Sequence, residues 1–429
     1  MESILNIQDK CAVDESIKSL ETYAYQPISG TKYNIAGQIV IRIENTDAFF
    51  IPSDSWLQIE GKLVKDSDGT SVFATGKNIT LTNNGLLFLF DNMKYDLNGQ
   101  EIESVYHPGY ATTMLGLAKY SSDFNAGPGL NQCWCIDTMA TAVDGNEGFK
   151  RRVDYVLEKP APKGSFRFAI PLKHAFGFCD DYPKVVCGFT QTLTLVRSAS
   201  SKNALFRDAG AADGRIVIEK ISWMMPKVEP SDGDKYQLYK IIESKATLEV
   251  CFRQRQCSSI ALPPTQRYTW QLGVRSLSDR PRYIIIALQT DKSNDETKNT
   301  ATFDHCQLTN IYVLLNNVRY PAIDFNADFT KYQYENLYKC FCDFMQKFYG
   351  IDRLVTSTAV DPFLYKELYP LFICDVSKQS ERLQQGVVDV TIEMFFGANI
   401  PGNTSAYAVM ISDRKLKFQS DGKKMNVIY

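Results

Sequence analysis

Two pairs of cysteines are the first candidates for chemistry in this sequence. Cys133 and Cys135 stand one residue apart, and so do Cys340 and Cys342. Zinc sites usually space their paired ligands about two to four residues apart and need further Cys or His ligands around the same ion. Residues i and i+2 of a helix point about 200° apart, so Cys340 and Cys342 cannot share one helix face. We therefore interpret all four as structural thiols of the core and expect no metal site.

The histidines and glycines form no other catalytic pattern. The three histidines, His107, His174 and His305, stand in neither an HExxH motif nor an i, i+4 arrangement. The GxSxG, GxxxxGK[ST] and GxGxxG motifs are all missing, so serine-hydrolase, P-loop and dinucleotide-binding chemistry lack their usual signatures. We interpret His174 as a surface or hydrogen-bonded residue. We expect no catalytic residue and no cofactor, which favours a structural or binding role over an enzyme.

Two short acidic segments are similar to fragments of calcium loops. Asp66-Ser67-Asp68-Gly69 and Asp232-Gly233-Asp234 lack the further ligand position and the closing Glu that an EF-hand needs. We interpret each as a hairpin or linker turn. Basic residues outnumber acidic ones near the end of the sequence, and we interpret this modest basic tail as a solvated strand face: Arg414, Lys415, Lys417, Lys423 and Lys424.

Composition and charge exclude several classes of protein. The 429 residues are 44% hydrophobic and 22% charged, as in ordinary globular proteins. The formal net charge is −2, so the chain lacks the basic field of a nonspecific nucleic-acid binder, and we expect no specific nucleic-acid partner. The longest apolar runs fall far short of the ~20 residues of a transmembrane helix. The first residues show no secretory signal, so we expect cytoplasmic synthesis and mostly free thiols among the 11 cysteines.

Short β-branched and aromatic runs separated by turn residues predict a mainly β protein. Gln38–Glu44 and Trp56–Leu63 alternate apolar and polar side chains with the period of a half-buried strand. Asn98-Gly99 fits the left-handed positions of a type I′ hairpin turn. The further strands that we predict are Ile79–Thr82, Leu86–Phe90, Ser165–Ile170, Val185–Val196, Arg215–Trp223, Ala246–Phe252, Tyr268–Val274, Tyr283–Gln289, Leu308–Asn316, Val387–Phe396 and Ala406–Ile411.

Helices are few and fall in the long segments between strands. Apolar residues at helical spacing predict a helix over 331–349, with Thr330 and Gln333 as a capping box and Gly350 just after its end. Asp361-Pro362 begins a shorter predicted helix over 361–369, and a third helix is predicted over 110–119. These patterns together support tandem β-sandwiches with helices in their loops.

A proline-rich segment divides the predicted strands into two groups. Prolines, glycine and acids gather between Met225 and Asp234, and we expect them to stop strand pairing and to connect two domains. Trp223 ends the strand before this segment, so we expect it to be buried. The predicted division is an N-terminal arm over 1–30, a first sandwich over 31–225, a connector over 226–240, a second sandwich over 241–412 and a C-terminal tail over 413–429.

Three stretches carry a resemblance to a known family. Ile216–Pro226, Arg280–Ile286 and Leu308–Pro321 resemble, in order and spacing, the double jelly-roll major capsid proteins of adintoviruses, Polintons (Mavericks) and related double-stranded DNA viruses. In that family a Ser-Trp-x-x-Pro element closes the first jelly roll, Arg-Pro-Arg opens a central strand of the second, and a strand ending in Tyr-Pro leads to an Asp-x-Asn loop and a helix. Here Asp324-Phe325-Asn326 and the predicted helix over 331–349 occupy the corresponding places, while Asn317 stands where the family often has Ser.

The resemblance implies two tandem eight-stranded jelly-roll β-sandwiches with short helices in the long loops. It implies a viral major capsid protein that forms homotrimers, tiles with neighbouring capsomers into an icosahedral shell, and meets a single jelly-roll minor or penton capsid protein. Such a protein resides in the virion after synthesis in the host cytoplasm. The alternative is a domesticated, endogenised copy that oligomerises without building virions. A lectin- or cupin-like binding protein is less favoured, because cupin metal sites need several His ligands close together.

Overall fold

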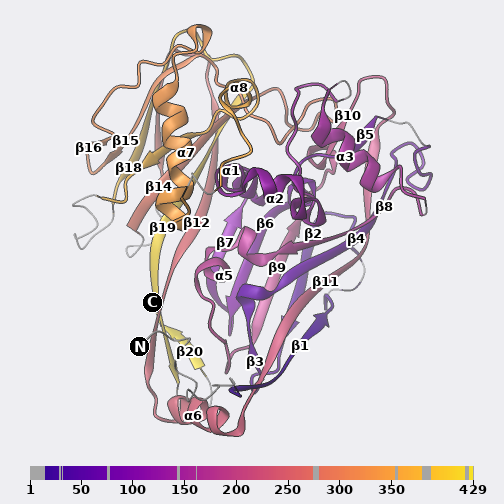
Figure 1. Ribbon diagram of the computed structural model, residues 1–429, viewed down its shortest axis with the longest axis vertical. Coiled ribbons are helices and arrows are strands. Elements are labelled where there is room, and N and C mark those ends of the chain that lie inside the picture. Colours follow the sequence, from indigo (N-terminus) through magenta and orange to yellow (C-terminus); the bar gives the residue numbers. More distant parts are fainter. Residues whose placement is uncertain are drawn as a thin grey trace, which may run out of the picture.

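The computed structural model shows two lobes side by side, joined at their base (Figure 1). It describes residues 15–28, 30, 32–74, 78–142, 145–160, 162–273, 280–352, 356–378, 388–420 and 425–428. Strand β11 (Gly214–Pro230) ends the first lobe, and helix α6 (Asp232–Glu243) connects it to β12 (Thr247–Leu262), which begins the second. The fold is mainly β, as predicted.

The first lobe is a sandwich of two antiparallel sheets. One sheet has the order β1 (Ile17–Tyr25), β11, β4 (Trp56–Lys65) and β8 (Ser165–Pro171), with the short β3 (Phe49–Phe50) also paired to β11. The facing sheet has the order β2 (Gly37–Ile43), β9 (Gln191–Arg197), β6 (Phe90–Leu97) and β7 (Gln100–Tyr106). The small pair β5 (Ile79–Leu81) and β10 (Leu205–Arg207) stands apart from both sheets.

The second lobe repeats this arrangement. Its first sheet has the order β12, β19 (Thr404–Ser420), β14 (Arg280–Thr290) and β17 (Phe372–Asp375), and β20 (Met425–Ile428) pairs with the end of β19. Its second sheet has the order β13 (Arg267–Leu272), β18 (Val390–Phe396), β15 (Leu308–Leu315) and β16 (Val318–Tyr320).

The two lobes have the same strand order. When the eight principal strands of each lobe are numbered along the chain, both lobes have one sheet in the order 1-8-3-6 and a facing sheet in the order 2-7-4-5. This order defines the jelly roll, an eight-stranded double-sheet sandwich. The predicted fold of two tandem jelly rolls is therefore confirmed.

The helices occupy the loops, as predicted. Between the fifth and sixth strands of the first jelly roll lie α1 (Pro108–Lys119), α2 (Ser122–Ala126) and α3 (Glu147–Val156). The corresponding loop of the second jelly roll holds α7 (Glu335–Tyr349) and α8 (Pro362–Glu367). Helices α4 (Leu172–Ala175) and α5 (Gly177–Asp181) follow β8, and the 3-10 turns are η2 (Pro52–Asp54), η3 (Gly85–Leu89), η4 (Pro128–Gln132), η5 (Lys202–Ala204) and η6 (Phe329–Lys331).

The alternation of apolar and polar side chains determines which face of each strand points into the core. Ile39, Ile41 and Ile43 of β2 are all buried, while the residues between them are partly or fully exposed. The turn between β6 and β7 has Asn98 and Gly99 at φ 49° and 78°, which confirms the predicted left-handed pair. Trp223 is fully buried, also as predicted.

One predicted strand is wrong. Leu86–Phe90 was expected to be extended, but Gly85–Leu89 form the turn η3 with every residue buried. The preceding Asn84 has a left-handed φ of 60°, and its side-chain amide donates to the hydroxyls of Thr112 and Thr113 in α1. A five-residue apolar run fits either conformation, so these contacts across the sequence determine its geometry.

The prolines do not stop strand pairing, which corrects the interpretation of 226–240 as a plain connector. β11 continues to Pro230 and pairs with β1 along this segment. The carbonyl oxygen of Pro226 accepts from the Ile51 N–H at 3.0 Å, so the missing N–H of this proline belongs to the side of β11 away from β1. Asp232-Gly233-Asp234 is the first turn of α6 and not a linker turn, whereas Asp66–Gly69 does form a turn, with Asp68 accepting from two backbone N–H groups.

The ends of other predicted segments also differ. Helix α7 begins at Glu335 without the predicted capping box, because Asp328 caps η6 instead and Tyr332 has a left-handed φ of 60°. Gly350 ends it at φ 70° as predicted. Strand β1 lies within the segment predicted as an arm, and β19 and β20 continue through the predicted tail, of which 421–424 and 429 lie outside the described residues. The division of the chain into domains remains a prediction.

Candidate functional site at the seam between the lobes

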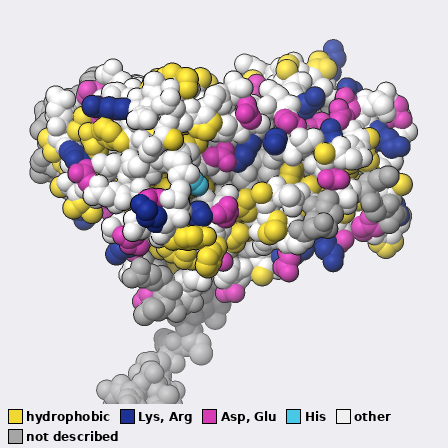
Figure 2. All heavy atoms as spheres, turned by 90° about the horizontal axis from the view of Figure 1, so that it is seen from above, with side chains coloured by type: hydrophobic (Ala, Val, Ile, Leu, Met, Phe, Trp, Pro, Cys, Tyr) yellow, Lys and Arg dark blue, Asp and Glu magenta, His cyan; other side chains and the backbone are white. Residues whose placement is uncertain are grey.

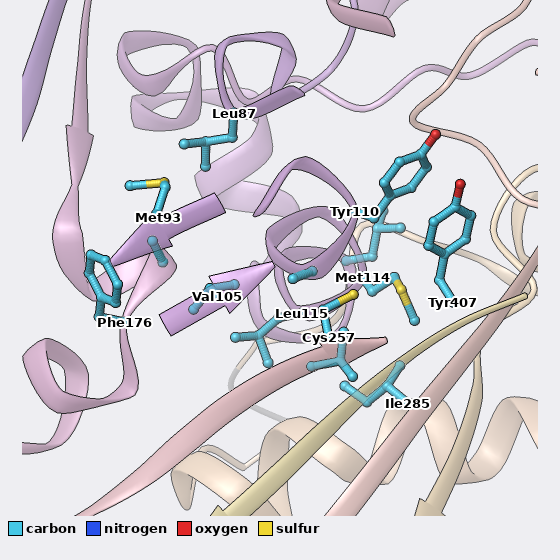
Figure 3. Packing of buried hydrophobic residues seen from close by; sticks show 14 of the residues in the cluster. Leu87, Met93, Val105, Tyr110, Met114, Leu115, Phe176, Cys257, Ile285 and Tyr407 are labelled. Carbon is cyan, nitrogen blue, oxygen red and sulfur yellow. The ribbon is translucent and has the colours of Figure 1, made fainter. Parts of the chain in front are cut away.

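Helix α1 fills the space between the two lobes. Every residue from Pro108 to Ala118 is buried, and small or apolar side chains cover all sides of the helix, as expected of a helix enclosed by protein. Figure 3 shows Met114 and Leu115 of this helix close to Cys257 and Ile285 of the second lobe. One cluster of buried hydrophobic side chains therefore extends through both lobes.

Two aromatic contacts fix the position of α1. The rings of Tyr110 on α1 and Tyr407 on β19 are stacked with centroids 3.9 Å apart and planes 13° apart. On another side of the helix, a Cβ atom at Gly116 would lie 2.3 Å from the indole of Trp134, so only glycine permits this close approach. The helix is held between an aromatic residue of each lobe.

Paired charges lie below α1, where α5 meets β12. Asp180 and Asp181 end α5, and Arg253 and Arg255 lie on the same face of β12. Arg255 Nη2 donates to Asp180 Oδ2 at 2.6 Å, and Arg253 Nε donates to Asp181 Oδ2 at 2.8 Å. The approach is so close that a Cβ atom at Gly177 would lie 1.8 Å from the Arg253 carbonyl oxygen.

Glu103 of β7 adds a third carboxylate to this seam. Its Oε1 accepts from the Arg255 N–H at 2.8 Å, and its Oε2 accepts from the Phe178 N–H at 2.9 Å. Burial raises the pKa of Glu103 to about 7, because the Arg255 guanidinium and the backbone donors offset only part of the lost hydration. One side chain of the first jelly roll thereby joins β7, α5 and the backbone of the second jelly roll.

Lys119 and His174 complete the group. Lys119 Nζ donates to Asp180 Oδ1 at 3.0 Å, and burial lowers the pKa of Lys119 to about 8 although Asp180 opposes the shift. His174 is buried with Nδ1 at 3.0 Å from the Tyr120 hydroxyl, and burial, followed by the charges of Lys119 and Arg255, lowers its pKa well below the ordinary value. Three carboxylates thus face three cations, and the arrangement fastens the lobes together.

A second buried ion pair joins the upper loops. Arg152 of α3 donates from Nη2 to Asp137 Oδ1 at 2.7 Å, and the two side chains are 2% and 0% exposed. Asn299 of the second lobe donates to Asp137 Oδ2 at 2.8 Å, and the Tyr369 hydroxyl accepts from the Asp137 N–H at 2.9 Å. A buried pair of this kind is costly to break, because either partner alone would be an uncompensated charge.

A third contact closes the base. Asn98, in the turn between β6 and β7, donates from Nδ2 to the Met425 carbonyl oxygen at 2.6 Å. The Met425 N–H donates to the Gly188 carbonyl oxygen at 3.2 Å, and Met425 and Val427 are buried. Strand β20 of the second lobe therefore holds the lower loops of the first.

The residues first considered for chemistry do not come together. Cys133 and Cys135 are buried, and burial raises the pKa of Cys133 to about 11, whereas Cys340 and Cys342 are half-buried on α7. His107 lies next to Ser259 with 3.2 Å between Nε2 and Oγ, and His305 stacks on Phe329. Among the described residues no group of three or more His, Cys, Asp or Glu could hold a metal ion.

Sequence comparison places the chain in a family. The profile of the double jelly roll-like domain matches residues 79–416, which is most of the chain. The chain belongs to the double jelly roll-like domain family. No curated protein sequence matches this double jelly-roll protein.

Solved capsid structures share the fold of this double jelly-roll protein. The Faustovirus major capsid protein has a TM-score of 0.59 at 9% identity, with 97% of this chain and 93% of that chain covered. The PBCV-1 virus capsid model gives 0.57 at 10% identity, with 98% and 99% covered, and the mavirus major capsid protein gives 0.56 at 12%, with 99% and 92% covered. At such low identity the likeness concerns the fold.

The surface of this double jelly-roll protein is mixed in charge on the face seen from above, where Figure 2 shows acidic, basic and apolar side chains interspersed over both lobes. No helix within the described ranges is long and apolar enough to span a membrane.

The sequence patterns did not predict the polar contacts between the lobes. Two features of the sequence could have indicated the ion pairs between α5 and β12. Arg253 and Arg255 stand two residues apart, as on one face of a strand, and Asp180-Asp181 supplies two adjacent carboxylates.

Proposed function

We propose that this double jelly-roll protein is a viral major capsid protein whose trimers form pseudo-hexagonal capsomers and assemble into an icosahedral shell. The observation that carries the proposal is the repetition of one strand order in two lobes that buried contacts hold in a fixed relation. Three copies around a threefold axis would present six similar lobes, which suits a near-hexagonal tile. The shared fold with the Faustovirus, PBCV-1 and mavirus capsid proteins supports this reading.

Three motifs support a narrower assignment to the adintovirus and Polinton lineage. Ser222-Trp223-x-x-Pro226 lies in the last strand of the first jelly roll, Arg280-Pro281-Arg282 begins β14, and the strand ending at Tyr320 is followed by the Asp324 loop and α7. We also propose virion localisation after cytoplasmic synthesis, with no enzymatic role. A six-lobed tile does not fit a fivefold vertex, so the proposal includes a single jelly-roll minor or penton protein as partner.

Light scattering coupled to size-exclusion chromatography tests the trimer. The purified chain should have three times its 48.6 kDa monomer mass. A monomer at micromolar concentration in several buffers would contradict the proposal. Electron microscopy of the same material should show hexagonal outlines and, at higher concentration, curved lattices or shells; trimers that never assemble further would favour the domesticated alternative.

A further inference from the structure

Strand β1 is the edge of a sheet and is exposed on both faces. Among the residues that the structure describes, β11 is its one partner strand, and seven of its nine residues are exposed while Ser19 and Tyr25 are partly buried. Figure 1 shows β1 at the lower margin of the first lobe. Ile17, Leu20 and Tyr23 are 52%, 58% and 42% exposed, so the strand presents apolar side chains to solvent.

The register shows which backbone groups of β1 remain open. Pro226 directs its carbonyl oxygen to Ile51, away from β1, so Met225 and Lys227 on either side direct their groups toward β1. Their partners Tyr23 and Glu21 therefore face β11.

The alternate residues of β1, Leu20, Thr22 and Ala24, direct their N–H and C=O groups outward. In the part of the chain that the structure describes, these outward groups have no backbone partner. An open edge of this kind is a template for another strand.

We propose that β1 of one copy pairs antiparallel with β1 of a second copy in a neighbouring capsomer, around a twofold axis at Thr22. The inference rests on the proposed function, because only an assembling shell brings these edges together at high concentration. A twofold axis at Thr22 places Leu20 opposite Ala24 and Thr22 opposite its own counterpart. All three outward residues of each copy then gain backbone partners.

The side chains favour a second copy as the occupant of this edge. In this register Glu21 lies opposite Tyr23 of the other copy, and Tyr23 already donates to Glu21 Oε2 at 2.7 Å within its own strand. Leu20 of one copy packs against Ala24 of the other, and the two Thr22 side chains lie opposite each other. No like charges are opposed in this register. A twofold axis at Glu21 would instead place two carboxylates opposite each other, which is unfavourable.

A cysteine substitution tests the pairing directly. In a hydrogen-bonded antiparallel pair the Cα atoms are about 5.5 Å apart, within the range that disulfides bridge, so Thr22→Cys should crosslink copies on mild oxidation of assembled protein. The matched control is Ala24→Cys, whose counterpart would lie about 14 Å away and cannot be bridged. For Thr22→Cys we expect a band at twice 48.6 kDa that disappears on reduction. Ala24→Cys and the parent should give no such band.

A proline substitution tests whether assembly depends on the edge. Thr22→Pro removes only an outward N–H, so trimer mass and melting temperature should stay as in the parent while shells are lost. Thr22→Val keeps that N–H and should assemble, whereas Tyr23→Pro removes a donor to β11 and should lower the melting temperature. If the parent forms no shells, the proposed function fails together with this inference. If the parent forms shells but Thr22→Cys does not crosslink and Thr22→Pro assembles normally, only this inference is overturned.

Discussion

The two long helical insertions stand at the same point of the two jelly rolls and have different surroundings. In the first jelly roll α1 is buried on all sides between the lobes. In the second, α7 buries one face, including Phe341 and Phe344, and leaves the other face exposed. Phe344 meets Tyr283 of its own lobe edge to face, with ring centroids 5.1 Å apart.

This difference shows how a repeated fold can serve two purposes. The first insertion supplies α1 to the shared core, Lys119 to the charged group at the seam, and the buried pair of Arg152 and Asp137, so it holds the lobes in one relation. The second insertion covers its own sheet and keeps an outer face available. The first insertion is thus enclosed by both lobes, whereas the second reaches the first lobe through Tyr349 and Tyr369 and leaves one face of α7 open to solvent.

The largest expected contrast concerns ion pairs in the two insertions. Arg152→Met leaves Asp137 as an unpaired charge in the interior and should lower the free energy of unfolding by ~3–5 kcal/mol. The control Lys339→Met breaks the pair with Asp343 on α7, where the lysine is 62% exposed, and should cost less than about 1 kcal/mol. Urea denaturation of unassembled protein measures both, and equal losses would contradict the contrast.

The next effect is a pH dependence at the seam. Glu103 has a pKa of about 7 in the folded protein, above the ~4.3 of an ordinary Glu in the unfolded chain. A raised folded-state pKa stabilises the folded protein at low pH, and this contribution is lost as the pH rises from about 4 to about 7. The neutral His174 acts in the opposite direction, since the unfolded chain binds a proton there below about pH 6.5.

A substitution isolates the Glu103 contribution from that of His174. The stability of the parent minus that of Glu103→Gln should fall by about 2–3 kcal/mol between pH 4 and pH 7. Thermal unfolding across this range measures the difference. Glu101→Gln, a partly exposed carboxylate on the same strand, is the control, and a profile for Glu103→Gln parallel to that of the parent would contradict the assignment.

The smallest expected effect is the coupling between aromatic rings. A double-mutant cycle with Tyr110→Leu and Tyr407→Leu should give a coupling of about 0.5–1.5 kcal/mol across the seam. The exposed pair Tyr332 and Phe363 on the second insertion, with centroids 6.2 Å apart, should couple by less than about 0.5 kcal/mol. A reversed order would contradict the closer aromatic packing at the first insertion.

Local patterns in the sequence predict most of the elements. Alternation identified β2 and β4, and Asp361-Pro362 identified α8, where the Asp361 carboxylate accepts from the Leu364 N–H at 2.8 Å. These features depend on neighbours in the sequence, and so a single chain is enough to recognise them. The resemblance of three motifs to a known family supplied the double jelly-roll fold, which local patterns cannot.

The errors and omissions arose where distant residues decide the structure. The turn η3 follows Asn84, whose side chain donates to Thr112 and Thr113 of α1. Because these partners lie in another element, the local sequence does not reveal the turn. Glu103 and Arg255 are separated by 152 residues along the chain, so no local pattern indicates that they share a buried seam. The prolines of β11 do not stop strand pairing because the missing N–H of Pro226 lies on the side of β11 away from β1, and this side is known only once the neighbouring strands are placed.

The hydrogen bonds at the base join residues far apart in the chain, and this has a consequence for synthesis on the ribosome. Asn98 and Met425 are 327 residues apart, and Lys18 meets Asp232 across 214 residues. At translation rates of about 5–20 residues per second, Asn98 waits some tens of seconds for its partner to be made. Nascent chains are therefore long-lived with an open base and an unpaired first strand, and a cell that makes many copies at once must keep these edges apart until each chain has closed on itself.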